Sequence, residues 1–264
     1  MSEALSPAPP AALKACCAEV WSHPGVRLLC GEALRPGGID LTARALDLMG
    51  LERGARVLDL GSGTGATLGL LTAHGLRAVG ADYSHALAAE SGTVVPSVVA
   101  DAERPPFRSG GMDAVLMECV LSAVPDKRSA VGEVVRMLRP EGWFVLSDIV
   151  VEGMLPPPLD SFAGWIACAA GALPAGEYAA LLEGSGLTLV AREDHGAAVS
   201  AMLGQVTRRL ALIQGGMRAG LVDLGAVLGG EGLLEMGERL LGVAKEAVDS
   251  GLLGYALFVG RAEP

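Results

Sequence analysis

The glycine-rich segment at residues 57–65 constrains the fold of this chain more than any other feature. It has the sequence Val-Leu-Asp-Leu-Gly-Ser-Gly-Thr-Gly and directly follows Arg56. Glycine adopts the left-handed backbone that a sharp turn needs, and it lets the main chain approach a ligand closely where a helix begins. The segment therefore predicts a strand over Arg56–Leu60, a ligand-binding turn and a helix, which together open a parallel α/β sheet.

Six further apolar and β-branched runs predict strands at Arg77–Asp82, Ser97–Ala100, Asp113–Glu118, Gly142–Val151, Leu187–Arg192 and Tyr255–Arg261. Between the fourth and fifth of the seven strands, apolar residues recur at the spacing of one helix face: Val131, Val134, Val135 and Leu138. Alternation of strands and helices is typical of βαβ units. We therefore expect an α/β fold with a Rossmann-like, seven-stranded sheet.

The chain has 264 residues, which is enough for this sheet and an appendage. Residues 1–50 are predicted to form a helical N-terminal arm or lid, and residues 51–196 with 254–264 the sheet domain. Residues 197–253 are predicted to form a helical insertion before the last strand, with helical patterns at Met202–Ile213 and Leu233–Val248. The insertion is expected to cap the sheet; a substrate or homodimer surface is the alternative.

Charge and hydropathy exclude several classes of partner. The chain has 20 Lys and Arg against 30 Asp and Glu, which gives a net charge of −10, and its basic residues do not cluster. We therefore expect no binding to a nucleic-acid backbone. The best apolar run, Phe162–Leu173, is shorter than the ~20 residues of a membrane-spanning helix. Residues 1–13 lack the basic and apolar pattern of a secretory signal. We expect a cytoplasmic protein with no membrane or nucleic-acid partner.

Acidic residues stand beside three of the predicted strands. Asp59 precedes the glycine turn, Asp82 ends the second strand, and Asp101 follows the third, with the small Ala102 beside it. A carboxylate at Asp82 suits a ribose diol, and one at Asp101 suits an adenine amino group. The set favours a nucleoside-containing cofactor. Gly61, Gly63 and Ala66 also fit a relaxed dinucleotide fingerprint, so a nicotinamide dehydrogenase remains an alternative.

With these residues, the segment from Leu46 to Arg192 resembles class I S-adenosylmethionine methyltransferases. The resemblance implies S-adenosylmethionine as the cofactor, a methyltransferase activity and a cationic sulfonium that acidic surroundings favour. It also implies a set of cofactor-binding residues: Asp59, Gly61, Ser62, Gly63, Thr64, Gly65, Asp82, Tyr83, Asp101, Ala102 and Glu118.

The segment Glu118-Cys-Val-Leu-Ser-Ala-Val-Pro-Asp-Lys127 is similar to a motif of arsenite methyltransferases, Asn-Cys-Val-x-Asn-Leu-x-x-Asp-Lys. Cys119 matches the arsenic-binding cysteine of that motif, and Cys168, in Cys168-Ala-Ala-Gly-Ala, matches a later one. The resemblance implies that arsenic(III), which is thiophilic, is held by thiolates and accepts the methyl group. A third ligand would come from Cys16, Cys17 or Cys30, and Cys17 is the candidate adopted with Cys119 and Cys168.

Two other functions fit the same sequence. One is a small-molecule O-, N- or C-methyltransferase in which the cysteines only pack and Glu118 or His195 is the base. The other is a non-catalytic module of the same fold that acts as a sensor or scaffold. In the first of these, replacing Cys119 with serine would cost little activity. The expected partner in every case is a small-molecule or metalloid ligand.

Overall fold

The computed structural model describes residues 10–31, 33–161, 163–164, 167–219 and 231–264. One sheet holds the seven strands: β1 (Arg56–Leu60), β2 (Arg77–Asp82), β3 (Ser97–Val99), β4 (Met112–Glu118), β5 (Leu138–Val151), β6 (Leu187–Asp194) and β7 (Leu253–Ala262). Their order is β3-β2-β1-β4-β5-β7-β6. The first five strands in chain order pair in parallel, and β7 runs antiparallel to both β5 and β6. The predicted α/β fold with seven strands is confirmed.

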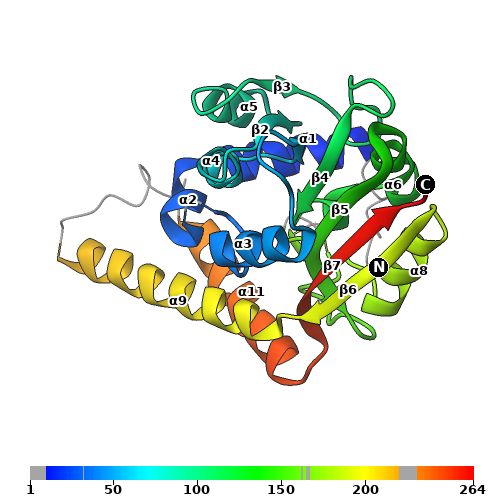
Figure 1. Cartoon of the computed structure of the whole chain (residues 1–264). Coiled ribbons are helices and arrows are strands. Elements are labelled where there is room, and N and C mark those ends of the chain that lie inside the picture. The colour runs from blue at the N-terminus through cyan, green and yellow to red at the C-terminus, as the bar shows by residue number, and fades with distance from the viewer. Residues whose placement is uncertain (1–9, 32, 162, 165–166, 220–230) are drawn as a thin grey trace.

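Helices flank this sheet (Figure 1). They are α1 (Pro10–Ser22), α2 (Pro24–Cys30), α3 (Gly38–Met49), α4 (Ala66–Ala73), α5 (His85–Ser91), the 3₁₀ turn η1 (Leu121–Ala123), α6 (Lys127–Met137), α8 (Ala175–Glu183), α9 (Gly196–Arg218) and α11 (Glu231–Asp249). One core cluster packs α6 and α8 on the sheet, and a second packs α3, α4, α9 and α11. None of the helices described combines the length and apolarity needed to cross a bilayer.

Strand β5 begins four residues before the predicted start at Gly142. Pro140 therefore lies inside the strand, and helix α6 ends before it, at Met137. The pairing with β4 is interrupted here, because Leu138 pairs with Met112 and the next pair is Trp143 with Ala114. Proline cannot donate a ladder hydrogen bond, so it fits in such an interruption.

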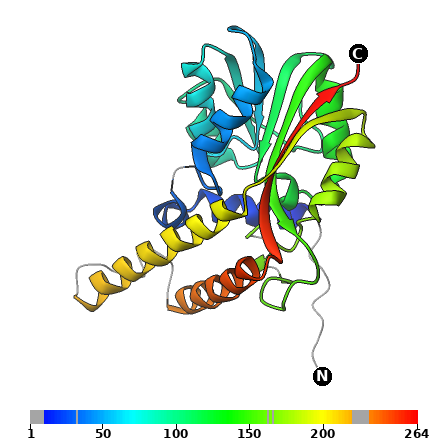
Figure 2. The same cartoon turned by 60° about the horizontal axis from the view of Figure 1, so that its bottom comes forward.

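The N-terminal helices and the insertion lie at one end of the sheet. Figure 2 shows α1 and α2 crossing this end, with α9 and α11 beyond them. Nη1 of Arg209 on α9 donates to the carbonyl oxygen of Leu29 at 2.8 Å, which ties the insertion to α2. The predicted helical character of both segments is confirmed where they are described, and α9 and α11 extend beyond the predicted patterns.

Candidate functional site

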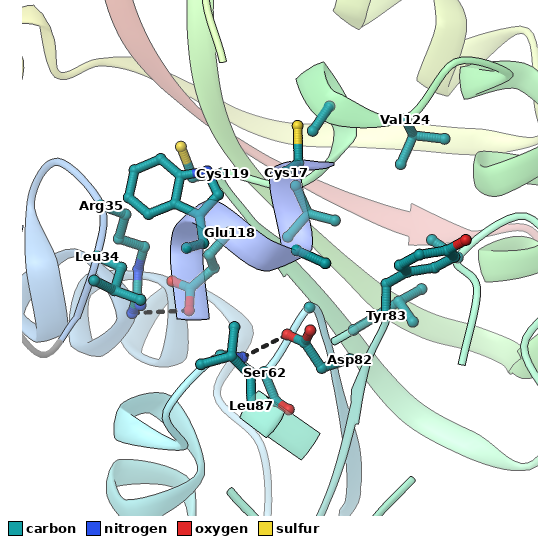
Figure 3. A pocket seen from close by; sticks show the side chains of 18 of the residues that line it. Cys17, Leu34, Arg35, Ser62, Asp82, Tyr83, Leu87, Glu118, Cys119 and Val124 are labelled. Carbon is teal, nitrogen blue, oxygen red and sulfur yellow. Dashed lines mark hydrogen bonds and ion pairs between the residues drawn. The ribbon is translucent and has the colours of Figure 1, made fainter. Parts of the chain in front are cut away.

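A pocket opens at the carboxyl ends of β1, β2 and β4, where α1 covers the sheet (Figure 3). Open α/β sheets bind ligands at this end of their strands. Most of the predicted cofactor residues line it: Gly61, Ser62, Gly63, Thr64, Asp82, Tyr83, Asp101, Ala102 and Glu118. Asp59 and Gly65 are not among the residues that line this pocket. The strand ends thus bring together residues that are far apart in sequence.

The glycine turn has the geometry that the sequence predicts. Gly61 and Gly63 have φ angles of +93° and +51°, in the left-handed region that favours glycine. A Cβ on Gly61 would lie 2.2 Å from Cγ2 of Val120, whereas one on Gly63 would meet nothing within 4 Å. The backbone at Gly63 is therefore open to a ligand, which fits the methionine part of S-adenosylmethionine.

Asp82 is held against this turn by main-chain hydrogen bonds. The amide of Gly63 donates to its Oδ2 and the amide of Ser84 to its Oδ1, both at 2.8 Å. Burial raises the pKa of Asp82, and these two hydrogen bonds oppose the rise. The carboxylate is thus fixed on the pocket wall where the resemblance expects a ribose.

Asp59 does not line the pocket, although the resemblance implies that it binds the cofactor. Its side chain is 2% exposed, and its Oδ2 has no hydrogen-bond partner among the described residues. Burial, and then the charge of Glu118, raise its pKa to about 8, although Arg35 lowers it. Asp59 is therefore a buried acid behind the pocket wall.

Glu118 reaches the pocket but is already paired. Its Oε1 accepts from the hydroxyl of Thr42 at 2.8 Å, and its Oε2 accepts from the hydroxyl of Thr67 at 2.7 Å. Nη2 of Arg35 lies 2.9 Å from the same Oε2, and Figure 3 shows the two side chains joined. Both oxygens are therefore engaged with the protein. Arg35 was missed by sequence reasoning, because a single arginine in the arm forms no pattern.

A second missed residue closes the far end of the pocket. Lys14 on α1 donates to Asp101 at 2.8 and 2.7 Å and lies 2.7 Å from Glu103. Its ammonium group is also 5.9 Å from the ring centroid of Tyr83. Burial would lower the pKa of Lys14, but the two carboxylates outweigh it and raise the pKa. The acid expected to face adenine is thus already in contact with the arm.

The three cysteines proposed as acceptor ligands line the same pocket. Cys17 comes from α1, Cys119 follows β4 and Cys168 lies between β5 and α8. Sγ of Cys168 is 4.0 Å from the carbonyl oxygen of Cys119, and both residues have positive φ, +62° and +59°. Cys16 and Cys30 do not line it. The structure therefore singles out Cys17 from the three candidates in the arm.

Two of these thiols, those of Cys119 and Cys17, have raised pKa values. A hydrogen bond with Cys168, followed by burial, raises the pKa of Cys119 well above its ordinary value. Burial, followed by the charge of Cys168, raises the pKa of Cys17 to about 12. In the ranges described, no three His, Cys, Asp or Glu side chains are arranged as a metal-ion site.

His195, considered as a base, lies elsewhere. Its Nε2 is 3.1 Å from Oε2 of Glu193 on β6, and it does not line the pocket. Since Glu118 is paired with Arg35, neither base candidate from the sequence is free in this pocket.

Comparisons with known proteins connect this geometry to a family. Residues 58–146 match the family model described as a methyltransferase domain. A demethylmenaquinone methyltransferase from Beutenbergia cavernae is 35% identical over 143 residues, which cover 52% of this chain and 58% of that relative. The chain therefore matches little more than half the length of this relative.

Solved structures share the fold at lower identity. The mycolic acid cyclopropane synthase CmaA1, solved with SAH, has a TM-score of 0.74 at 17% identity, covering 93% of this chain and 98% of that one. The [4+2]-cyclase SpnF has a TM-score of 0.73 at 17% identity, covering 93% and 95%. Because a cyclase shares the fold, the fold alone does not specify the reaction.

The matched segment contains the glycine turn, Asp82 and Asp101, so it decides between the two interpretations of that turn in favour of methyltransferases. Residues 58–146 therefore match a methyltransferase domain, and this match supports S-adenosylmethionine as the cofactor.

Proposed function

We propose that the protein methylates a thiophilic acceptor, with arsenite as the first candidate, bound by Cys17, Cys119 and Cys168. One observation carries this proposal: thiols from three distant parts of the chain line the pocket that also contains the glycine turn. Soft centres such as arsenic(III) select sulfur ligands, so three thiols in one pocket suit such an acceptor better than an oxygen-rich one.

The chemistry of capture balances with protonated thiols. Arsenite is neutral As(OH)₃ in water, and each thiol can replace one hydroxyl, forming an As–S bond while its proton leaves with that hydroxyl as water. The raised thiol pKa values are therefore no obstacle, because no free thiolate has to persist before the acceptor arrives.

The pocket would then orient the acceptor for transfer. S-adenosylmethionine supplies the methyl group on a cationic sulfonium. Three sulfur ligands leave the lone pair of arsenic as the nucleophile, so transfer forms an As–C bond, and the electrons of the broken S–C bond stay on the cofactor sulfur. Cys168 and Cys17 are 3% and 7% exposed, so α1 and the surrounding chain shield these two thiols from solvent. Positioning and exclusion of water are the contributions this reaction needs.

The test is to incubate reduced protein with S-adenosylmethionine, arsenite and a small thiol, and to measure S-adenosylhomocysteine and methylated arsenicals by mass spectrometry. We expect methylated arsenic, and its loss in Cys17→Ser, Cys119→Ser and Cys168→Ser. Cys30→Ser is the matched control, because Cys30 does not line the pocket. Full methylation by Cys119→Ser, or cofactor binding without any methylated arsenic, would contradict the proposal.

A second candidate is a small organic acceptor of the quinone type. It is favoured by the printed name of the relative, a demethylmenaquinone methyltransferase, and by apolar side chains on the lining, among them Trp21, Leu34, Val120 and Val124. This function predicts methylation of a demethylmenaquinone analogue that survives Cys119→Ser. Cofactor binding without turnover of either acceptor would instead indicate a sensor or scaffold.

A further inference from the structure

A buried ion pair connects the N-terminal arm to the catalytic pocket. Arg35, between α2 and α3, has a side chain 7% exposed, and that of Glu118, at the end of β4, is 3% exposed. Leaving either charge buried without the other is strongly unfavourable. The arm segment that carries Arg35 therefore cannot move away without disturbing the end of β4.

Two threonine hydroxyls close this pair into a ring. Nη2 of Arg35 donates to Oγ1 of Thr42 at 2.6 Å and to Oγ1 of Thr67 at 2.8 Å. Each hydroxyl in turn donates to one oxygen of Glu118. Thr42 lies on α3, and Thr67 lies in the first turn of α4, directly after the glycine turn. The ring thus joins the arm, α3, the cofactor turn and the end of β4.

The residues beside both members of the ion pair have unusual backbones. Leu34, which precedes Arg35, has φ +51°, and Cys119, which follows Glu118, has φ +59°. Such conformations are unfavourable in residues other than glycine and persist only where the surroundings hold them. The amide of Cys119 also donates to the carbonyl of Ser147 at 2.7 Å. Cys119 is therefore held between Ser147 and the Arg35–Glu118 pair.

We propose that Arg35 is a positioning residue, which sets both the glycine turn and the thiol of Cys119 when the N-terminal arm docks. Arg35 acts through Glu118 and Thr67 rather than on the methyl group itself. The part of this proposal that concerns Cys119 rests on the proposed acceptor site. The part that concerns the glycine turn rests only on cofactor binding.

The test compares Arg35→Met with Arg27→Met. Arg27 lies on the same arm and pairs with Glu90, but both side chains are partly exposed and neither lines the pocket. We expect Arg35→Met to raise the dissociation constant of S-adenosylmethionine, measured by calorimetry, about tenfold or more. We expect it to speed iodoacetamide alkylation of Cys119, located by peptide mass spectrometry, by a similar factor. Arg27→Met should change neither by more than about twofold.

Cys30 serves as an internal reference for these rates. A general loss of stability would speed alkylation of Cys30 and Cys119 alike, whereas loss of positioning speeds that of Cys119 selectively. Arg35→Lys, which keeps a positive charge opposite Glu118, should recover most of the affinity and of the Cys119 protection. Thr42→Val keeps the ion pair and removes one hydroxyl, so its cofactor affinity and Cys119 alkylation rate should lie between those of the parent and of Arg35→Met. This variant tests the proposal if Arg35→Met does not fold.

A folded Arg35→Met with the cofactor affinity and Cys119 rate of Arg27→Met would overturn the proposal. So would equal acceleration at Cys30 and Cys119. Neither measurement requires an acceptor, so failure of arsenite methylation and failure of the Arg35 proposal are distinguishable.

Discussion

The ammonium group of Lys14 lies 2.7 Å from Oδ2 of Asp101, which joins helix α1 to the loop that follows strand β3. Lys14 is 10% exposed and Asp101 35%, so this pair is partly screened by solvent. Together with Glu103, it holds α1 over one end of the pocket. Arm docking should therefore depend on it to a modest extent.

Lys14→Met is expected to weaken the docking of α1. Pairs with this exposure contribute about 1 kcal/mol or less, so proteolysis within residues 10–22 should quicken by no more than about fivefold, and added salt should reproduce much of the effect. The measurement is limited proteolysis followed by mass spectrometry. Lys245→Met, which breaks an exposed pair with Asp249 on α11, is the control. An unchanged cleavage pattern in Lys14→Met would show that the contact does not hold the arm.

Asp82→Ala should weaken cofactor binding with little effect on the fold. The loss of a hydrogen bond to a charged group is worth about 1–3 kcal/mol, which corresponds to roughly 5- to 150-fold in the dissociation constant. Calorimetry with S-adenosylmethionine measures it. Asp113→Ala makes a matched control, because Asp113 pairs with Arg56 and Arg139 and is not on the pocket lining. Equal affinity in the two variants would remove Asp82 from the cofactor site.

The raised pKa of Asp59 predicts that the stability of the fold depends on pH. Its pKa rises from an ordinary 3.8 to about 8 in the folded chain. Between these values the unfolded state loses the proton while the folded state keeps it, so the free energy of unfolding falls as pH rises, by up to about 1.4 kcal/mol per pH unit. This contribution is complete below about pH 4 and is lost as pH passes through 8.

Asp59→Asn removes that titration while keeping the size of the side chain. Thermal unfolding of both proteins from pH 5 to 9 should show the variant gaining stability relative to the parent as pH rises. Parallel curves would mean that Asp59 is ionised in the folded protein.

The fold was predictable because its signals are local. Strands are recognised in the sequence as apolar runs. The turn is recognised by Gly61 and Gly63, whose backbones are left-handed, and the ligand-binding edge by the acidic Asp82 and Asp101 near strand ends. Among the strand boundaries, only the start of β5 differs from the prediction by more than two residues, since proline in a strand interruption looks in sequence like a helix stop.

The parts of the site that sequence missed depend on tertiary contacts. Lys14 meets Asp101 across 87 residues of chain, and no spacing rule connects single charged residues at such a distance. Glu118 lines the pocket as expected of a cofactor residue, but the sequence does not show that its oxygens contact Thr42, Thr67 and Arg35. The sequence analysis adopts Cys17 but leaves Cys16 and Cys30 open as alternatives, because sequence alone does not show which of them faces the pocket. Neighbouring helical residues point about 100° apart, and only the docking of α1 decides which one faces the pocket.

Gly61→Ala is the sharpest test of the cofactor turn. Gly61 has φ +93°, and a Cβ there would lie 2.2 Å from Cγ2 of Val120, which itself lines the pocket. Gly54 provides a matched position, because it has φ +85° and its Cβ would meet nothing within 4 Å. Both substitutions incur the left-handed backbone cost of about 1–2 kcal/mol, but only Gly61→Ala must also displace Val120.

We therefore expect Gly54→Ala to lower the unfolding free energy by about 1–2 kcal/mol and to leave cofactor affinity unchanged. Gly61→Ala should cost more than about 2 kcal/mol and reduce binding of S-adenosylmethionine at least tenfold, since Val120 must move against the pocket. Chemical denaturation and calorimetry measure the two quantities separately. If the variants prove equal in both, the close approach of Gly61 to Val120 has no part in shaping the cofactor site, and the turn needs its glycine for backbone conformation alone.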